Sequence, residues 1–193
     1  TPSMFMSVVF PETRFDGSIM ITASHLPYNR NGLKFFNADG GLEHADITDL
    51  LETAAVLSAG QADISKVSKV DLISLYAQSL CEKIRLGVKA DDYDRPLAGL
   101  HIVVDAGNGA GGFFVRQVLE PLGADTAGSQ FLEPDGMFPN HIPNPENKQA
   151  MDSVRAATVE HHADMGIIFD TDVDRMSAVL HDGSEVNRDA IIA

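Results

Sequence analysis

Three aspartates stand at alternate positions in the stretch "FDTDVDR", which runs from Phe169 to Arg175. They follow an apolar segment typical of a β-strand, and in extended backbone all three carboxylates would point to the same side. Three close carboxylates repel one another unless a cation lies between them, and hard oxygen ligands favour Mg²⁺ or Ca²⁺ over zinc. The sequence therefore predicts a divalent-cation site at Asp170, Asp172 and Asp174, with a solvated acidic turn as the alternative.

A second group of reactive side chains lies in "ITASHLPYNRNGLKFF", residues 21–36. The apolar run Ile19 to Ile21 predicts a buried strand that ends in a polar loop. Ser24, His25 and Lys34 bring a hydroxyl, an imidazole and an amine to this segment, and together they could serve one phosphoryl-transfer site. A hydrolase triad is disfavoured because the glycine pattern of a nucleophile elbow is absent around Ser24, and capping of local backbone remains the alternative role for this serine.

A glycine-rich turn follows the apolar segment of "VVDAGNGAGG". Gly107, Gly109 and Gly112 match the G-x-G-x-x-G pattern of dinucleotide-binding proteins. Such a site would also need an acid at the far end of the next strand to hold the ribose, but Asp125 lies at the start of that segment. The pattern therefore favours a tight packing turn between strand and helix over dinucleotide binding.

Composition narrows the class of protein. The chain has 193 residues, is 44% hydrophobic and carries a net charge of −14, which disfavours nucleic-acid binding because phosphate backbones require clustered Lys and Arg. No apolar run approaches the ~18 residues that suggest a membrane span. The single cysteine, Cys81, lies in an amphipathic helical pattern, so packing is favoured over catalysis.

Periodicity and turn residues predict two α/β domains. Helices are expected at about 46–58 and in a segment that ends near Gly87, and the polar run "KADDYDRP" at 89–96 predicts a boundary between domains at 1–93 and 94–193. The second half is expected to form an apolar strand before the glycine turn, a helix that ends by Gly123, a helix over 148–162 and a strand at 163–169. A strand, an Asp182-Gly183 turn, a short strand and the start of a helix should follow. This alternation predicts mostly parallel sheets covered by helices.

Four motifs taken together resemble the α-D-phosphohexomutases, the phosphoglucomutase and phosphomannomutase superfamily. They are "TASHLPYNRNGLK", "VVDAGNGAGG", "EPDGMFPNHIPNPE" and "FDTDVDR". They occur in the family's order and approximate spacing, and the resemblance covers nearly the whole chain. It implies two three-layer α/β/α domains with mostly parallel mixed sheets. These would be the later part of the family's first domain, at 1–93, and most of its second, at 94–193.

The resemblance also implies roles for individual residues. Ser24 matches the phosphoserine, and His25 and Lys34 match neighbours that contact substrate and assist proton transfer. The aspartates at 170, 172 and 174 match magnesium ligands, with Ser24 as a further ligand, and Arg175 matches the arginine beside the metal loop. The chain departs from the family at three positions. Leu26 stands where Asn is common, and Thr171 and Val173 stand where Gly and then Gly or Ala are common.

The function implied is that of a Mg²⁺-dependent isomerase. It would interconvert hexose 1-phosphate and hexose 6-phosphate through a phosphoserine enzyme and a hexose bisphosphate, with no nucleic-acid or membrane partner. Family members have four domains, so the resemblance implies a fragment with little activity alone. The alternative is a non-catalytic metal- or phosphosugar-binding module derived from this fold. The cytoplasm is the expected compartment, and an organelle stays open because "TPSMFMSVVF" lacks an initiator Met.

Overall fold

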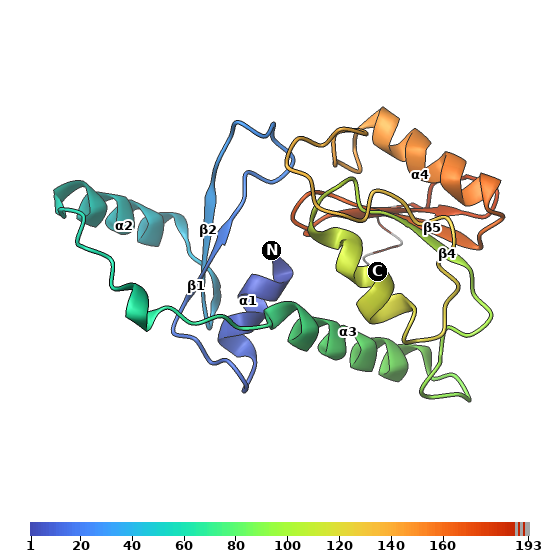
Figure 1. The fold of residues 1–193 in the computed structure, drawn as a ribbon, viewed down its shortest axis with the longest axis horizontal. Helices are drawn as coiled ribbons and strands as arrows, with labels where there is room; N and C mark the ends of the chain where they lie inside the picture. The colour runs from blue at the N-terminus through green and yellow to red at the C-terminus, as the bar shows by residue number, and fades with distance from the viewer. Residues whose placement is uncertain (188, 190, 192–193) are drawn as a thin grey trace.

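The computed structural model describes all residues except 188, 190, 192 and 193, and it forms two α/β units joined by a long helix (Figure 1). The elements in chain order are α1 (Pro2–Val9), β1 (Ser18–Ile21), β2 (Leu33–Asn37), β3 (Gly40–Gly41), α2 (His44–Val56), η1 (Ile64–Lys66), α3 (Leu72–Val88), β4 (Ile102–Asp105), η2 (Ala110–Gly112), the π-helical η3 (Val115–Leu119), α4 (Lys148–Glu160), β5 (Met165–Phe169) and β6 (Met176–Leu180). No helix within the described ranges is long and apolar enough to cross a membrane.

The first unit is an antiparallel sheet in the order β1-β2-β3, with α1 against one face. Ser18 anchors this packing because its hydroxyl donates to the Met4 carbonyl at 2.6 Å. The expected strand is present, but the expectation that it is buried is wrong. Ile19 and Ile21 are 49% and 73% exposed. They alternate with Ser18 and Met20, which face α1, so they point to the sheet face that α1 does not cover.

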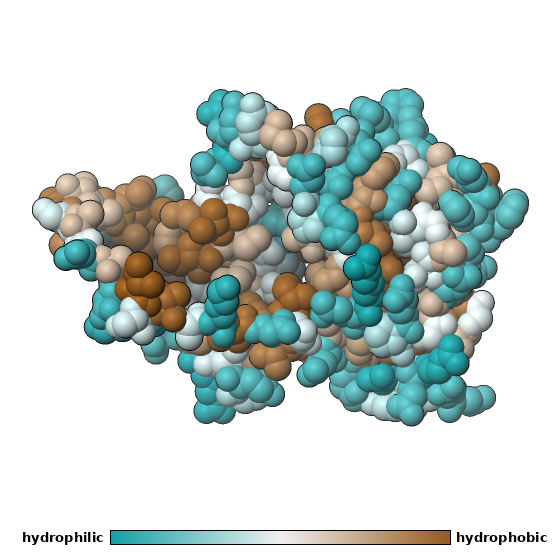
Figure 2. Space-filling view, viewed as in Figure 1, coloured by the Kyte–Doolittle hydropathy of each residue, from teal (hydrophilic) through white to brown (hydrophobic). Residues whose placement is uncertain are grey.

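The helix expected at about 46–58 is α2, and it begins two residues earlier. Glu43 and Asp46 form a reciprocal capping box at its start, which explains the shift. None of its residues is buried. Exposed apolar side chains gather over α2 and the segment after it, at the left of Figure 2; the most exposed are Leu51, Val56, Leu57, Ile64 and Val67.

The helix expected to end near Gly87 is α3, and it lies between the two units. It contacts α1 of the first unit and η3 of the second, and it buries Ala77 and Cys81 in the larger core. The Cys81 thiol donates to the Gln117 carbonyl at 3.4 Å, and burial raises its pKa, so the thiol packs as the sequence predicted. Because α3 contacts both units, the division at residues 93 and 94 stays a prediction.

The second unit has the three layers of an α/β/α domain. Its sheet runs β4-β5-β6, with β4 and β5 parallel and β5 and β6 antiparallel. Val104 and Ile167 face α3 and η3, whereas Val103 and Ile168 face the opposite side, where α4 packs. The predicted α/β class is thus confirmed, and the β4-β5-β6 sheet is mixed. Parallel pairing between the named strands is confined to β4 and β5, since the β1-β2-β3 sheet is antiparallel throughout.

The segment after the glycine turn is helical as expected and ends before Gly123, but its helical type is irregular. It forms the short η2 and then η3, in which Glu120 N–H donates to the Val115 carbonyl with π-helical spacing. The helix over 148–162 and the strand at 163–169 are confirmed as α4 and β5. The Asp182-Gly183 turn after β6 is confirmed too. The helix expected at the last residues falls on a stretch that includes the four undescribed positions.

Candidate active site

The loop that carries Ser24 is held by the hairpin of β1 and β2. Thr22 N–H donates to the Gly32 carbonyl at 2.9 Å, and a Cβ at Gly32 would lie 2.5 Å from the Thr22 carbonyl oxygen, so glycine permits this close pairing. Ser24 has a positive φ of 53°, and its N–H donates to the Thr22 hydroxyl at 2.9 Å. In the same hairpin Lys34 pairs with Met20. The two strands therefore bring Ser24, His25 and Lys34 to one end of the sheet.

The three aspartates lie on the loop between β5 and β6. Their carboxylates converge as predicted, with one oxygen from each within 4.8 Å of the others. The predicted extended backbone is wrong, because residues 171–174 form a turn in which Val173 has a φ of 61°. Asp170 shapes this turn: its Oδ1 accepts from the N–H groups of Asp174 and Arg175, both at 3.1 Å.

The glycine turn packs directly against this acidic loop. Ala110 N–H donates to the Thr171 carbonyl at 2.8 Å, and a Cβ on Gly109 would lie 2.7 Å from the same oxygen. At Gly112 a Cβ would lie 1.9 Å from the Leu132 carbonyl oxygen. These contacts support the sequence interpretation of the glycines as a packing turn.

The serine loop and the acidic loop meet through two cationic side chains. Arg175 Nη2 donates to the Ser24 hydroxyl at 3.2 Å and to His25 Nδ1, and its Nε donates to Asp170 at 3.1 Å. Lys34 Nζ lies 2.8 Å from Asp172 Oδ2 and 2.7 Å from Asp174 Oδ2. Together these contacts connect the serine loop to all three aspartates of the acidic loop.

Burial sets the titration of the acidic loop. Asp170 has no exposed surface, and burial, reinforced by the charges of Asp172 and Asp174, raises its pKa to about 6. Burial also favours a higher pKa at Asp172. Hydrogen bonds, of which the one from Lys34 is the strongest, outweigh burial and lower the pKa of Asp172. Burial also opposes the charge on Lys34, yet its bonds to Asp172 and Asp174 raise its pKa above the ordinary value.

The acidic loop has the donor set of a divalent-cation site. Asp172 is 1% exposed, and its Oδ1 has no hydrogen-bond partner among the described residues. An unpartnered buried carboxylate oxygen is costly, and a cation beside it would remove that cost. The three aspartates can therefore bind a hard metal ion.

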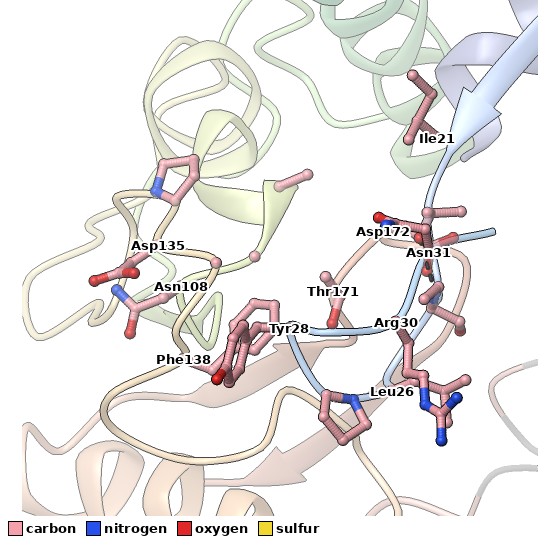
Figure 3. A pocket seen from close by; sticks show the side chains of 18 of the residues that line it. Ile21, Leu26, Tyr28, Arg30, Asn31, Asn108, Asp135, Phe138, Thr171 and Asp172 are labelled. Carbon is pink, nitrogen blue, oxygen red and sulfur yellow. Dashed lines mark hydrogen bonds between the residues drawn. The ribbon is translucent and has the colours of Figure 1, made fainter. Parts of the chain in front are cut away.

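An open cavity of about 380 Å³ lies beside these groups, between the two units. Ser24 lines it from the serine loop. Tyr28 and Arg30 line it from the same loop, and Asn108, Asp135 and Phe138 line it from the second unit (Figure 3). The sequence motifs contain these residues, but Asn108, Asp135 and Phe138 were not predicted to belong to the site. Two features of the sequence could have indicated them: the Asn within the glycine turn and the polar loop that follows the turn.

Comparison with known proteins identifies the origin of this arrangement. A sequence profile described as "Phosphoglucomutase/phosphomannomutase, alpha/beta/alpha domain II" matches residues 75–183, and the corresponding domain I profile matches residues 1–57. The chain belongs to the phosphoglucomutase/phosphomannomutase family. It is 33% identical over 174 residues to a phosphomannomutase/phosphoglucomutase of Pseudomonas putida, an alignment that covers 90% of this chain and 35% of that protein.

Other family members agree. A phosphoglucosamine mutase of Thermobifida fusca is 33% identical over 196 residues, covering 100% of this chain and 41% of its own length. The crystal structure of a phosphoglucomutase/phosphomannomutase family protein from Burkholderia thailandensis superposes with a TM-score of 0.68 at 29% identity, covering 90% of this chain and 35% of that one. The chain thus spans between about a third and two fifths of these relatives, and the fold is that of the family.

Proposed function

We propose that the complete protein carrying this chain is a phosphohexomutase that interconverts hexose 1-phosphate and hexose 6-phosphate. The observation that carries the proposal is the Arg175 contact, which joins the Ser24 hydroxyl to the acidic loop at 3.2 Å. Relatives named phosphomannomutase, phosphoglucomutase and phosphoglucosamine mutase support the same reaction type. We also propose that the chain divides into domains at 1–93 and 94–193 and that the protein is located in the cytoplasm.

In this proposal Ser24 carries the transferred phosphoryl group. The Oγ–P bond of phospho-Ser24 breaks as a sugar hydroxyl oxygen bonds to phosphorus, and the hydroxyl proton is taken up by a neighbouring base. The resulting hexose bisphosphate reorients, and its other phosphate returns to Ser24 while the sugar oxygen regains a proton. Each half-reaction conserves the phosphoryl group, so no water or nucleotide is consumed.

The side chains around Ser24 have separate tasks. Arg175 orients the serine oxygen and offers positive charge to the phosphoryl oxygens. The His25 imidazole can act as the base that accepts a proton, and Lys34 can donate one or bind phosphate. The carboxylates of Asp170, Asp172 and Asp174, with a phosphoryl oxygen on Ser24, would hold Mg²⁺. When bound, that ion neutralises charge on the transferred group.

Replacement of Ser24 by alanine tests the covalent role, because a methyl group cannot accept phosphate. In the complete protein we expect Ser24→Ala to abolish turnover of glucose 1-phosphate, and mass spectrometry to find phosphate on Ser24 of the wild type alone. Ser68→Ala is the matched control, since Ser68 is exposed and distant in sequence from the site. Activity within about tenfold of wild type in Ser24→Ala would rule out the covalent role, given the 10⁶-fold or larger accelerations usual for enzymes. A wild type with neither phosphate nor turnover would instead favour a non-catalytic binding module.

A further inference from the structure

Asp105, the last residue of β4, lies at a crossing of four chain segments. It has no exposed surface. Its carboxylate accepts hydrogen bonds from Gly107 N–H at 2.9 Å, Gln130 Nε2 at 2.8 Å, the Ser153 hydroxyl at 2.8 Å and His141 Nε2 at 3.0 Å. A carboxylate without water needs such donors, and it stays ionised most readily when one of them is positive. His141 is the donor that can carry charge.

The surroundings of His141 favour its charged form. The residue is 5% exposed, and its Nε2 lies 3.0 and 3.1 Å from the two oxygens of Asp105, while its Nδ1 lies 3.1 Å from the Ile142 carbonyl oxygen. Carbonyl and carboxylate oxygens only accept, so a proton on each ring nitrogen satisfies both contacts. Burial opposes the charge, but the hydrogen bond and attraction to Asp105 outweigh it and raise the pKa of His141. The ring of Phe131 packs edge-on against that of His141, with centroids 5.5 Å apart, and adds no charge.

The loop that carries His141 also supplies residues to the cavity. His141 does not line the cavity, but it belongs to the loop at 133–147 that supplies Asp135 and Phe138 to it (Figure 3). Away from the pair, the loop is tied to the glycine turn through Asn108: Asp135 N–H donates to its carbonyl at 2.9 Å, and Asn140 Nδ2 donates to its side-chain oxygen at 2.7 Å. The His141–Asp105 contact is thus the buried anchor of a loop that has no helix or strand of its own before α4.

We propose that His141, held by Asp105, is a positioning residue for this cavity. It fixes the loop so that Asp135 and Phe138 face the bound sugar phosphate, and it acts through the loop rather than by contact with the ligand. The identity of that ligand rests on the proposed mutase function, whereas the anchoring of the loop does not.

The first test replaces the anchor. His141→Gln keeps a donor for Asp105 but removes the charge and the second hydrogen bond. His181→Gln, at an exposed position after β6, is the control. In the complete protein we expect hydrogen exchange of residues 133–142 to accelerate at least ~10-fold in His141→Gln, where local opening governs exchange. KM for glucose 1-phosphate should rise about tenfold with kcat within about threefold, the pattern of lost binding rather than lost chemistry. Unchanged exchange, or a loss of kcat at constant KM, would overturn the proposal.

The second test uses pH and needs no variant. A histidine with a raised folded-state pKa stabilises fully below its unfolded value of ~6.5 and loses that contribution as pH rises through the folded-state value. Exchange of residues 133–142, corrected for its intrinsic pH dependence, should therefore accelerate between pH 6 and 9 in the wild type relative to α4. A flat corrected profile would contradict the anchor even if the enzyme is active. An accelerating profile in a protein that turns over neither glucose 1-phosphate nor mannose 1-phosphate would uphold the anchor and count against the proposed mutase instead.

Discussion

The Lys34 ammonium group contacts carboxylates that a divalent cation would also bind. Its Nζ lies 2.8 Å from Asp172 and 2.7 Å from Asp174, two of the three proposed Mg²⁺ ligands. A cation that binds these oxygens must displace the ammonium group or weaken its contacts. We therefore expect Lys34→Met to destabilise the metal-free chain and to tighten Mg²⁺ binding, because methionine keeps a long unbranched side chain and removes the charge.

The magnitude follows from the exposure of the pair. At an effective dielectric constant of about 20, each contact contributes roughly 6 kcal/mol of attraction, most of which lost hydration cancels. Asp172 is 1% exposed, but Lys34 and Asp174 are 33% and 29% exposed. The net value should lie between the ~1 kcal/mol of exposed pairs and the 3–5 kcal/mol of buried ones, so we expect a loss of about 1–3 kcal/mol without metal. Removal of about 1.4 kcal/mol of competition would raise Mg²⁺ affinity about tenfold.

Titration calorimetry and thermal melts with Mg²⁺ measure both effects. Lys66→Met is the matched control, since Lys66 is 82% exposed and its neighbour is Asp63. It should change neither affinity nor stability beyond experimental error. Asp172→Asn keeps the shape of the ligand and removes its charge, so its Mg²⁺-dependent rise in melting temperature should shrink. If Lys34→Met binds Mg²⁺ no more tightly than wild type, Lys34 does not compete with the ion. An unchanged Mg²⁺ response in Asp172→Asn would refute the metal site itself.

Two further predictions test the frame and the charge of the site. Gly112→Ala should destabilise the chain by about 2 kcal/mol or more, because its Cβ would lie 1.9 Å from the Leu132 carbonyl oxygen. Gly136→Ala, which meets nothing within 4 Å, should be close to neutral in the same denaturant melts, and equal effects would refute the packing argument. Lowering the pH from about 7.5 to 5 should weaken Mg²⁺ binding roughly tenfold, because Asp170, with a pKa of about 6, must be ionised to bind. Affinity that does not change with pH in calorimetry would exclude Asp170 as a ligand.

The sequence predicted which acidic residues gather but not how they do so. A period of two residues places alternate side chains on one side of a strand, and that argument fails for residues 171–174, which form a turn. The carboxylates converge because Asp170 accepts from the backbone N–H groups of Asp174 and Arg175, which curls the loop around it. Such a turn depends on hydrogen bonds between side chain and backbone, and hydrophobic periodicity contains no information about them.

Burial was predicted less well than secondary structure. An apolar run identifies β1, but whether Ile19 and Ile21 are covered depends on which elements pack on each sheet face. In the second unit, where α3, η3 and α4 cover both faces of the sheet, the apolar β4 segment is fully buried as its composition suggests. Local pattern therefore predicts burial only where the packing partners can be predicted too.

The pair formed by His141 and Asp105 was missed for a related reason. The two residues are 36 positions apart, and the apolar run before Asp105 predicts a buried strand end but no partner for its carboxylate. Only the crossing of β4, the glycine turn and the later loop brings them together. The glycine pattern did predict a long-range contact, because a position where another segment of backbone comes very close requires glycine. The pattern indicates the close approach without identifying the partner segment.

Two residues that are not glycine hold left-handed backbone where the serine and acidic loops face each other. Ser24 has a φ of 53° and Val173 a φ of 61°, and for a β-branched side chain this conformation is unfavourable by roughly 1–2 kcal/mol. Val173 nevertheless packs against the large core. On one side of it Ala110 N–H donates to the Thr171 carbonyl, and on the other Asp174 N–H donates to the Asp170 carboxylate. The shape of the acidic loop is thus imposed by its neighbours and not by residue preference. That is the condition under which three carboxylates can remain clustered before any cation joins them.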